Sequence, residues 1–277
     1  MTQPITTSTV DLEAVKRKQQ ATWASGDYSA VGALIPIISE DLCDAADLRA
    51  GSRILDVAGG SGNTALAAAR LFCDVVSLDY VASLLDRARE RAAAERLSVR
   101  FVEGDAEALP FEDESFDAVV SVLGVMFAPD QERAAAELER VCRPGGTFAL
   151  ASWTPEGFIG GLLKTVGKHV PPPAGVRPPT LWGDEEHLRG LLGPHIDGLR
   201  TERRSYTFRY RSAEHFVDFF EAYYGPTHRA FASLDDQGRA ALREDIVELV
   251  RSYDRLGDGT AVAIMAEYLQ AVATRAP

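Results

Sequence analysis

The sequence predicts an α/β fold in which a parallel sheet carries helices on both faces. Short apolar runs at residues 53–58, 74–79, 99–102, 116–122 and 147–153 predict strands, and glycines follow the first run. Amphipathic patterns of helical period separate most of these runs. Strands that alternate with helices form a doubly wound parallel sheet, and right-handed crossovers place the helices on both faces.

The predicted helices follow in order along the chain. Residues 11–47 have a helical pattern that is interrupted at Ser25-Gly26-Asp27, where glycine and aspartate favour a turn. Further helices are predicted between the strands, at residues 63–71, 81–96 and 130–142. Pro144, followed by two glycines, ends the last of them before the fifth strand.

The pattern changes after residue 153. Five of the 14 prolines lie in residues 171–179, which predicts an inserted, partly extended loop or lid. The segments beyond it predict a helix at 182–192, a strand at 206–210 and helices at 216–224 and 238–254. Residues 260–274 fit either a helix or a strand. We favour a strand, because the C-terminal segment often completes a sheet of this kind.

Charge and cysteine content limit the possible functions. The 277 residues carry a net charge of -12, which repels polyanions, so no nucleic-acid partner is expected. Cys43, Cys73 and Cys142 lie far apart, which favours buried apolar side chains over a disulfide framework or a metal site. No signal-peptide pattern is present, and no segment approaches the roughly 20 apolar residues that span a bilayer. We therefore expect a cytoplasmic monomer or homodimer without a membrane partner or a metal.

A glycine-rich segment at residues 55–63 carries the strongest local signal for a ligand site. Its glycines lie between a predicted strand and a predicted helix, where residues without a Cβ let the backbone turn sharply and approach a ligand. Asp56 lies just below this loop and could orient it or accept a hydrogen bond from an ammonium group. Residues 60–65 also fit the G-x-G-x-x-A dinucleotide fingerprint, and a tight turn without a ligand is the structural alternative.

Acidic residues follow the next two strands. Asp79 ends the second strand, where a carboxylate can accept hydrogen bonds from ribose hydroxyls, cap the following helix, or do both. Residues 103–111 follow the third strand, where an acidic side chain and a neighbouring backbone N–H can reach an adenine edge. The alternative is an ordinary acidic loop.

Together these motifs resemble the class I S-adenosylmethionine-dependent methyltransferases, in particular the branch with the ubiquinone/menaquinone-type C-methyltransferases and many bacterial natural-product methyltransferases. The resemblance covers roughly residues 50–153. It rests on residues 54–62, Asp79, residues 104–111, residues 115–120 and residues 138–146. The sequence differs at Ala58, where the family often has glycine.

The resemblance implies a Rossmann-like, mostly parallel sheet of seven strands with one antiparallel strand, helices on both faces, and a helical cap or lid. We accordingly expect N-terminal capping helices at 1–50, a cofactor-binding core at 51–153, a lid loop and sheet continuation at 154–211, a helical substrate cap at 212–257 and a final strand at 258–277.

The resemblance also implies S-adenosylmethionine as the cofactor and S-adenosylhomocysteine as the product. It places the glycine loop against the methionine part, Asp79 at the ribose, and Asp105 with Ala106 at adenine. The cofactor-binding residues expected on this basis are Tyr28, Asp56, Ala58, Gly59, Gly60, Gly62, Asp79, Tyr80, Asp105, Ala106, Ser121 and Leu123.

Segments outside the core are expected to form the acceptor pocket. Their aromatic side chains suit a flat or hydrophobic small molecule, and one near the sulfonium could add cation–π attraction. The expected substrate-binding residues are Trp23, Trp153, Trp182, Phe220 and Tyr223. The candidate catalytic residues are His228, His169 and Tyr224. An imidazole can act as a general base near neutral pH, although a surface or structural role is the alternative for each histidine.

We therefore expect methyl transfer to an O, N or C nucleophile of a small metabolite of the natural-product type. This reaction depends mainly on the alignment of the two reactants. One alternative is a protein that keeps the fold and the cofactor but catalyses cyclisation or only binds. The other is an NAD-dependent oxidoreductase, which would share the glycine loop and Asp79 but would not account for residues 104–106 or 143–146.

Overall fold

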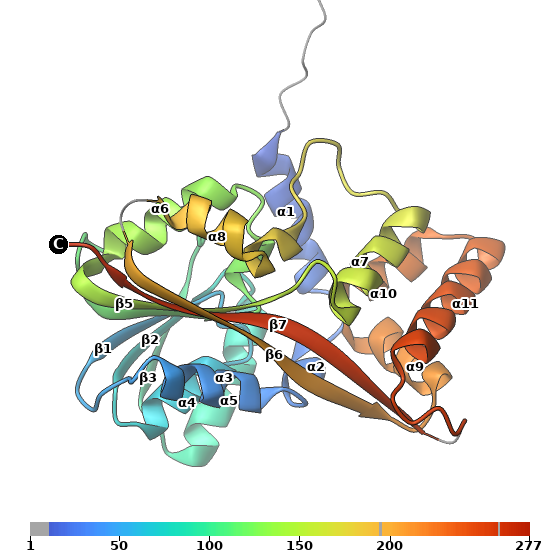
Figure 1. The fold of residues 1–277 in the computed structure, drawn as a ribbon, viewed down its shortest axis with the longest axis horizontal. Coiled ribbons are helices and arrows are strands. Elements are labelled where there is room, and N and C mark those ends of the chain that lie inside the picture. The colour runs from blue at the N-terminus through green and yellow to red at the C-terminus, as the bar shows by residue number, and fades with distance from the viewer. Residues whose placement is uncertain (1–10, 194–195, 260) are drawn as a thin grey trace, which may run out of the picture.

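The computed structural model describes residues 11–193, 196–259 and 261–277, and a seven-stranded sheet runs through its centre (Figure 1). The strands lie in the order β3-β2-β1-β4-β5-β7-β6. Their bounds are β1 Arg53–Val57, β2 Asp74–Asp79, β3 Val99–Glu103, β4 Phe116–Val122, β5 Cys142–Trp153, β6 Ile196–Tyr210 and β7 Val262–Arg275. Strand β7 is antiparallel to its neighbours β5 and β6, and the pairs among β1 to β5 are parallel. The predicted mostly parallel, Rossmann-like sheet is therefore confirmed.

Helices cover both faces of this sheet. Figure 1 shows α3, α4 and α5 on one face, with α6 and α8 on the other. The helices are α1 Leu12–Trp23, α2 Tyr28–Gly32, α3 Pro36–Ala45, α4 Asn63–Arg70, α5 Ala82–Glu95, α6 Gln131–Val141, α7 Phe158–His169, α8 Glu185–Leu192, α9 Ala213–Tyr223, α10 Gly225–Ser233 and α11 Asp236–Tyr253, with short 3₁₀ turns η1 Val125–Phe127 and η2 Pro179–Gly183. Because both faces are covered, the central strand β1 is apolar and buried at Ile54, Leu55 and Val57.

Two of these helices, α7 and α10, are not predicted from the sequence, because they contain glycine or proline. Helix α7 contains Gly160, which has no room for a side chain because a Cβ there would lie 2.5 Å from the backbone oxygen of Pro155. Helix α10 begins with Gly225 and Pro226, residues that usually signal a turn, although proline is well suited to the first turn of a helix. The C-terminal segment, which fitted either a helix or a strand in the sequence, is a strand, as expected. The expected division of the chain into segments also includes residues 1–10, 194–195 and 260, which lie outside the described residues.

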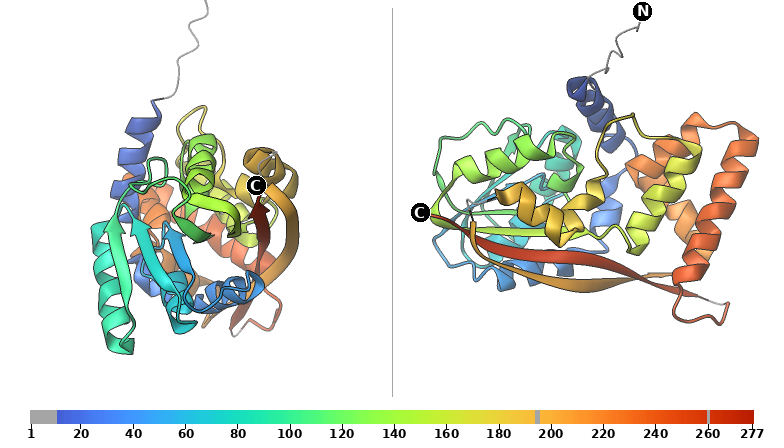
Figure 2. Two further views of the ribbon diagram at one scale, coloured as in Figure 1. Left: turned by 90° about the vertical axis from the view of Figure 1, so that its left-hand side faces the viewer. Right: turned by 45° about the horizontal axis from the view of Figure 1, so that its top comes forward.

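The N-terminal helices meet the C-terminal helical segment beyond the carboxyl ends of the parallel strands. The backbone N–H of Asp27 donates to the carbonyl of Tyr223 over 3.2 Å. A Cβ at Gly225 would lie 2.3 Å from the carbonyl oxygen of Thr22, so this close approach requires glycine. Figure 2 shows α9, α10 and α11 gathered with α7 at this end of the molecule. Within the described residues, no helix is both long enough and apolar enough to cross a membrane.

Candidate functional site

A pocket of about 920 Å³, partly open to solvent, lies where the parallel strands β1 to β4 end. The turns that follow these strands form its floor, and α1 and α2 form its outer wall. The strand order changes direction between β1 and β4, and open α/β sheets bind ligands at such switch points. We call it the cofactor pocket.

The glycine loop has a left-handed backbone at alternating positions. Ala58 has φ +54°, Gly60 has φ +54° and Gly62 has φ +89°. Side chains disfavour this conformation, which explains physically why glycine is common at the position of Ala58 in the family that the sequence resembles. Leu123, opposite this loop at the end of β4, also has a positive φ of +55°. Strained backbone of this kind is frequent at functional sites.

Asp56 supports the loop from below. Its side chain is 1% exposed, and its Oδ2 accepts a hydrogen bond of 3.0 Å from the Ser77 hydroxyl. A Cβ at Gly59 would lie 2.3 Å from Asp56 Oδ2, so only glycine fits above it. Burial, together with the nearby charge of Asp79, raises the pKa of Asp56 to about 7.

Asp79 connects the loop to the second strand. Its Oδ2 accepts a hydrogen bond of 2.9 Å from the Gly60 backbone N–H, and its Oδ1 accepts one of 2.8 Å from Val81 N–H. Burial raises the pKa of Asp79 to about 6, although these backbone hydrogen bonds oppose the shift. Each carboxylate oxygen has two lone pairs, so Asp79 can accept further hydrogen bonds from a ligand. The capping role and the ligand-binding role are therefore compatible.

At the other end of the pocket, Lys16 of α1 joins the acidic loop that follows β3. Its Nζ lies 2.7 Å from Asp105 Oδ2 and 2.6 Å from Glu107 Oε2. Asp79, Asp105 and Glu107 line the pocket, with Lys16 as the one ammonium group among its lining residues. With these groups charged, the described lining carries an excess of negative charge.

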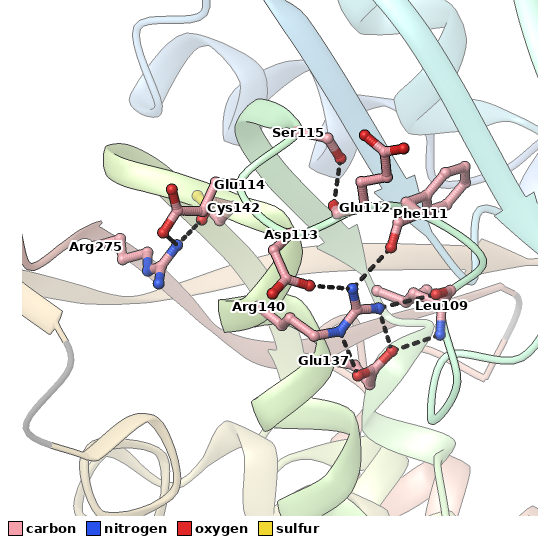
Figure 3. Close-up of polar contacts among 10 residues, drawn as sticks. All are labelled: Leu109, Phe111, Glu112, Asp113, Glu114, Ser115, Glu137, Arg140, Cys142 and Arg275. Carbon is pink, nitrogen blue, oxygen red and sulfur yellow. Dashed lines mark hydrogen bonds and ion pairs between the residues drawn. The ribbon is translucent and has the colours of Figure 1, made fainter.

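Arg140 holds the rest of this loop in place (Figure 3). Its guanidinium donates to the carbonyl oxygens of Leu109 over 2.9 Å and Phe111 over 2.7 Å, and to Asp113 Oδ1 over 2.8 Å. Glu137 pairs with Arg140 and also accepts a hydrogen bond of 2.7 Å from Leu109 N–H. Two motifs of the sequence, at residues 104–111 and 138–146, are thus parts of one contact that fixes the wall of the pocket.

A second, apolar cavity adjoins the cofactor pocket, and we call it the acceptor cavity. It is lined by Trp23, Tyr28, Val31, Ile35, Leu123, Phe127, Trp153, Ile159, Phe208, Phe220 and Tyr224. The two cavities share several of these residues, including Tyr28 and Leu123. Within the described part of the chain, the lining contains no histidine and no acidic or basic side chain.

Two tyrosines line the acceptor cavity. The ring centroids of Tyr28 and Tyr224 lie 6.3 Å apart. Burial, followed by the charge of Asp79, raises the pKa of Tyr28 to about 12, and burial raises the pKa of Tyr224 still further above its ordinary value. Both hydroxyls therefore remain protonated and can donate a hydrogen bond.

Many of the predicted site residues lie on these two cavities. The cofactor pocket is lined by Tyr28, Ala58, Gly59, Gly60, Asp79, Tyr80, Asp105, Ala106 and Leu123. The acceptor cavity is lined by Trp23, Trp153, Phe220 and Tyr224. Asp56, Gly62 and Ser121 lie behind the lining instead. The Ser121 hydroxyl donates to the carbonyl of Val57 over 2.7 Å and thereby joins the ends of β4 and β1.

The structure does not bring four other predicted residues to either cavity. His169 Nε2 lies 2.8 Å from Asp245 Oδ2, and His228 Nδ1 donates to the carbonyl of Glu221 over 3.0 Å. Trp182 is 1% exposed in the core, and Tyr223 is 38% exposed on the surface of α9.

Lys16 and Phe127 line the cofactor pocket but are not predicted from the sequence, and Glu107 is included there only as part of residues 103–111. Lys16 lies seven positions before Trp23 in the same helix, a spacing that places both on one face. That spacing was the available signal for Lys16. Phe127 carried no comparable signal, because it lies in a short 3₁₀ turn after β4.

Comparisons with known proteins agree with this geometry. A family model described as a methyltransferase domain matches residues 55–150. The uncharacterized protein Rv1405c of Mycobacterium tuberculosis is 43% identical over 245 residues, which cover 87% of this chain and 89% of that protein. The demethylmenaquinone methyltransferase of Deinococcus radiodurans is 39% identical over 171 residues, which cover 56% of this chain and 71% of that enzyme.

A solved structure shares the fold at low sequence identity. The crystal structure of the YcgJ protein from Bacillus subtilis superimposes with a TM-score of 0.59 at 20% identity. The match covers 86% of this chain and 98% of that protein, so the likeness extends well beyond residues 55–150.

Proposed function

The chain belongs to the class I S-adenosylmethionine-dependent methyltransferases, and on this basis we propose that it methylates an O, N or C nucleophile of a small hydrophobic or aromatic metabolite. We further propose that this acceptor is of the natural-product type. S-adenosylmethionine would supply an electrophilic methyl carbon, and the residues described above would align the acceptor with it and exclude water.

The charge of the cofactor pocket carries the proposal for the cofactor. Asp79, Asp105 and Glu107 line it together with a single ammonium group, that of Lys16, which pairs with Asp105 and Glu107. This lining favours a sulfonium cation and repels the pyrophosphate of a nicotinamide dinucleotide. A Cβ at Gly60 would face the ring of Tyr28 at 3.9 Å, so the absence of one leaves room for a ligand to approach the backbone closely.

The acceptor cavity supports the proposed substrate class. Its lining is apolar and largely aromatic, which favours a neutral, flat acceptor over a charged one. Tyr28 borders both cavities, so an acceptor that contacts Tyr28 would lie next to the cofactor. The protonated hydroxyls of Tyr28 and Tyr224 would orient it by hydrogen bonding. They would not remove its proton, which favours a neutral acceptor that is nucleophilic without a base, such as an aromatic amine.

The test is to incubate the purified protein with S-adenosylmethionine and a panel of phenols, enols and aromatic amines. Mass spectrometry would then follow S-adenosylhomocysteine and the methylated product. We expect both to appear in equal amounts with at least one neutral aromatic acceptor. Tight cofactor binding without turnover across a broad panel would favour cyclisation or binding alone. A thermal shift with NADH and none with S-adenosylmethionine would favour the oxidoreductase.

A further inference from the structure

Helix α1 forms part of the wall of the cofactor pocket, although little of it is buried. Lys16 and Trp23 line the pocket, and Val15 is the only residue of α1 that is almost fully buried. Isolated helices of this length are marginal in water, and burial of one valine contributes only about 1.5–3 kcal/mol. Polar contacts and the packing of Trp23 must therefore contribute much of the docking of α1.

Two side chains one helical turn apart make the main polar contacts. Lys16 Nζ lies 2.7 Å from Asp105 Oδ2 and 2.6 Å from Glu107 Oε2, and Gln20 Nε2 donates to the carbonyl of Tyr80 over 2.6 Å. Residues four positions apart lie on the same face of a helix. This face of α1 therefore contacts both acidic turns that border the pocket.

The partners of Lys16 are themselves firmly held. Glu107 Oε1 accepts a hydrogen bond of 2.8 Å from Asp130 N–H at the start of α6, and Asp105 Oδ1 accepts one of 2.9 Å from Glu107 N–H. The Lys16 side chain is 13% exposed and that of Glu107 is 3% exposed. Burial lowers the pKa of Lys16, but its hydrogen bonds to Asp105 and Glu107 outweigh this effect and raise it above the ordinary value, so Lys16 stays charged.

We propose that Lys16 is a positioning residue of the cofactor site, whose ion pairs with Asp105 and Glu107 fasten α1 over the adenine end of the pocket. This inference rests on the proposed function. The cofactor and its demethylated product leave only after these ion pairs break, so Lys16 controls how fast they exchange. Loss of its ammonium group would also leave Glu107 as a buried charge without its partner, which favours detachment of α1.

The experiment compares Lys16→Met with Lys18→Met, an identical change at an exposed lysine of the same helix. Each variant is loaded with radiolabelled S-adenosylmethionine, and release is timed after addition of excess unlabelled cofactor. We expect Lys16→Met to release it at least 10-fold faster than wild type, Lys18→Met to stay within twofold, and Lys16→Arg to restore much of the slow release. Equal release rates for the two methionine variants would overturn the proposal.

A second measurement does not require bound cofactor. Hydrogen exchange at the α1 amides of the free protein should be faster in Lys16→Met than in Lys18→Met, while the amides of β1 and β4 stay protected in both. Equal exchange in α1 would also overturn the proposal. If wild type bound no S-adenosylmethionine, the proposed function would fail. Faster hydrogen exchange of α1 in Lys16→Met would still show that Lys16 fastens this helix. If Lys16→Met did not fold, the same two measurements on Lys16→Gln, which removes the charge but keeps a polar side chain, would decide, and wild-type rates in that variant would contradict the role of Lys16.

Discussion

The carboxylate of Asp79 accepts a hydrogen bond of 2.9 Å from the backbone N–H of Gly60, although the two residues are 19 positions apart. This contact joins the end of β2 to the glycine loop after β1. The same carboxylate accepts from Val81 N–H at the start of the next helix. Asp79 therefore fixes the shape of the loop while it faces the pocket.

Replacement of Asp79 by alanine should remove both the support of the loop and the ligand acceptor. We expect the dissociation constant for S-adenosylhomocysteine to rise at least about 100-fold, because hydrogen bonds to a charged group contribute roughly 1.5–3 kcal/mol each. Titration calorimetry measures this change. Asp74→Ala, at the exposed opposite end of β2, is the matched control and should bind normally. Unchanged affinity in Asp79→Ala would exclude a role for Asp79 in cofactor binding.

A methyl group at position 59 should displace the glycine loop that lines the pocket. In Gly59→Ala the new Cβ would lie 2.2 Å from the Ser77 hydroxyl and 2.3 Å from Asp56 Oδ2, so the loop must move. We expect loss of cofactor binding and destabilisation by about 1–3 kcal/mol, the usual cost of overpacking. Gly190→Ala adds the same group in α8, where nothing lies within 4 Å, and should leave both properties unchanged or slightly raise stability. Normal binding by Gly59→Ala would contradict the close fit of the loop.

The buried acid Asp56 should make stability depend on pH. Its pKa is about 7 in the folded protein against an ordinary value of 3.8, so near pH 5 the folded state holds a proton that the unfolded state has lost. The stability that this proton binding gives to the folded state is fully present below the ordinary pKa of 3.8 and is lost as the pH rises through about 7. We expect the free energy of unfolding to fall by on the order of 1–3 kcal/mol between pH 5 and pH 8.

Asp56→Asn removes this titration, because an amide does not ionise. The free energy of unfolding of Asp56→Asn, measured with urea, should fall less between pH 5 and pH 8 than that of wild type. At pH 8 the variant should be more stable than wild type. Asp79, with a pKa raised to about 6, shifts stability in the same direction and remains in both proteins. Identical pH profiles for the two proteins would show that Asp56 is ionised in the folded state throughout this range.

Tyr224 lines the acceptor cavity and His228 does not, so substitutions at the two residues should have different effects. We expect Tyr224→Phe to lower kcat/KM for the acceptor at least about 10-fold, since a lost hydrogen bond near the reacting group is worth about 1.5 kcal/mol, and to leave cofactor affinity unchanged. The matched control is His228→Gln, which changes a residue of the adjacent helix that lines neither cavity. It should keep turnover within about twofold. A large loss of turnover in His228→Gln with normal turnover in Tyr224→Phe would support His228 as the general base and would contradict a role for Tyr224.

The parallel core could be predicted from the sequence because its signals are local. Each strand from β1 to β4 contains a short apolar run, and a glycine or an acidic residue lies at its end or within two positions after it. Carboxyl ends of parallel strands meet at one edge of the sheet, so Gly60, Asp79 and Asp105 were expected to lie near one another, and each lines the cofactor pocket.

The acceptor cavity and α1 were harder to predict because their contacts join distant segments. Phe208 of β6 and Ile159 of α7 line the same cavity as Trp23, but nothing near these residues in the chain indicates that they meet. The histidines were singled out for their chemistry, yet His169 faces Asp245 of α11. Side-chain chemistry alone does not determine which cavity a residue reaches.

Calorimetric titration of the purified, folded chain with S-adenosylmethionine and S-adenosylhomocysteine tests the central claim most directly. The account predicts saturable binding of each ligand, with one site per chain, and competition between the two. It also predicts no detectable binding of NAD under the same conditions. A folded protein that takes up neither sulfur nucleoside would contradict the assignment of the pocket beside Gly60 and Asp79.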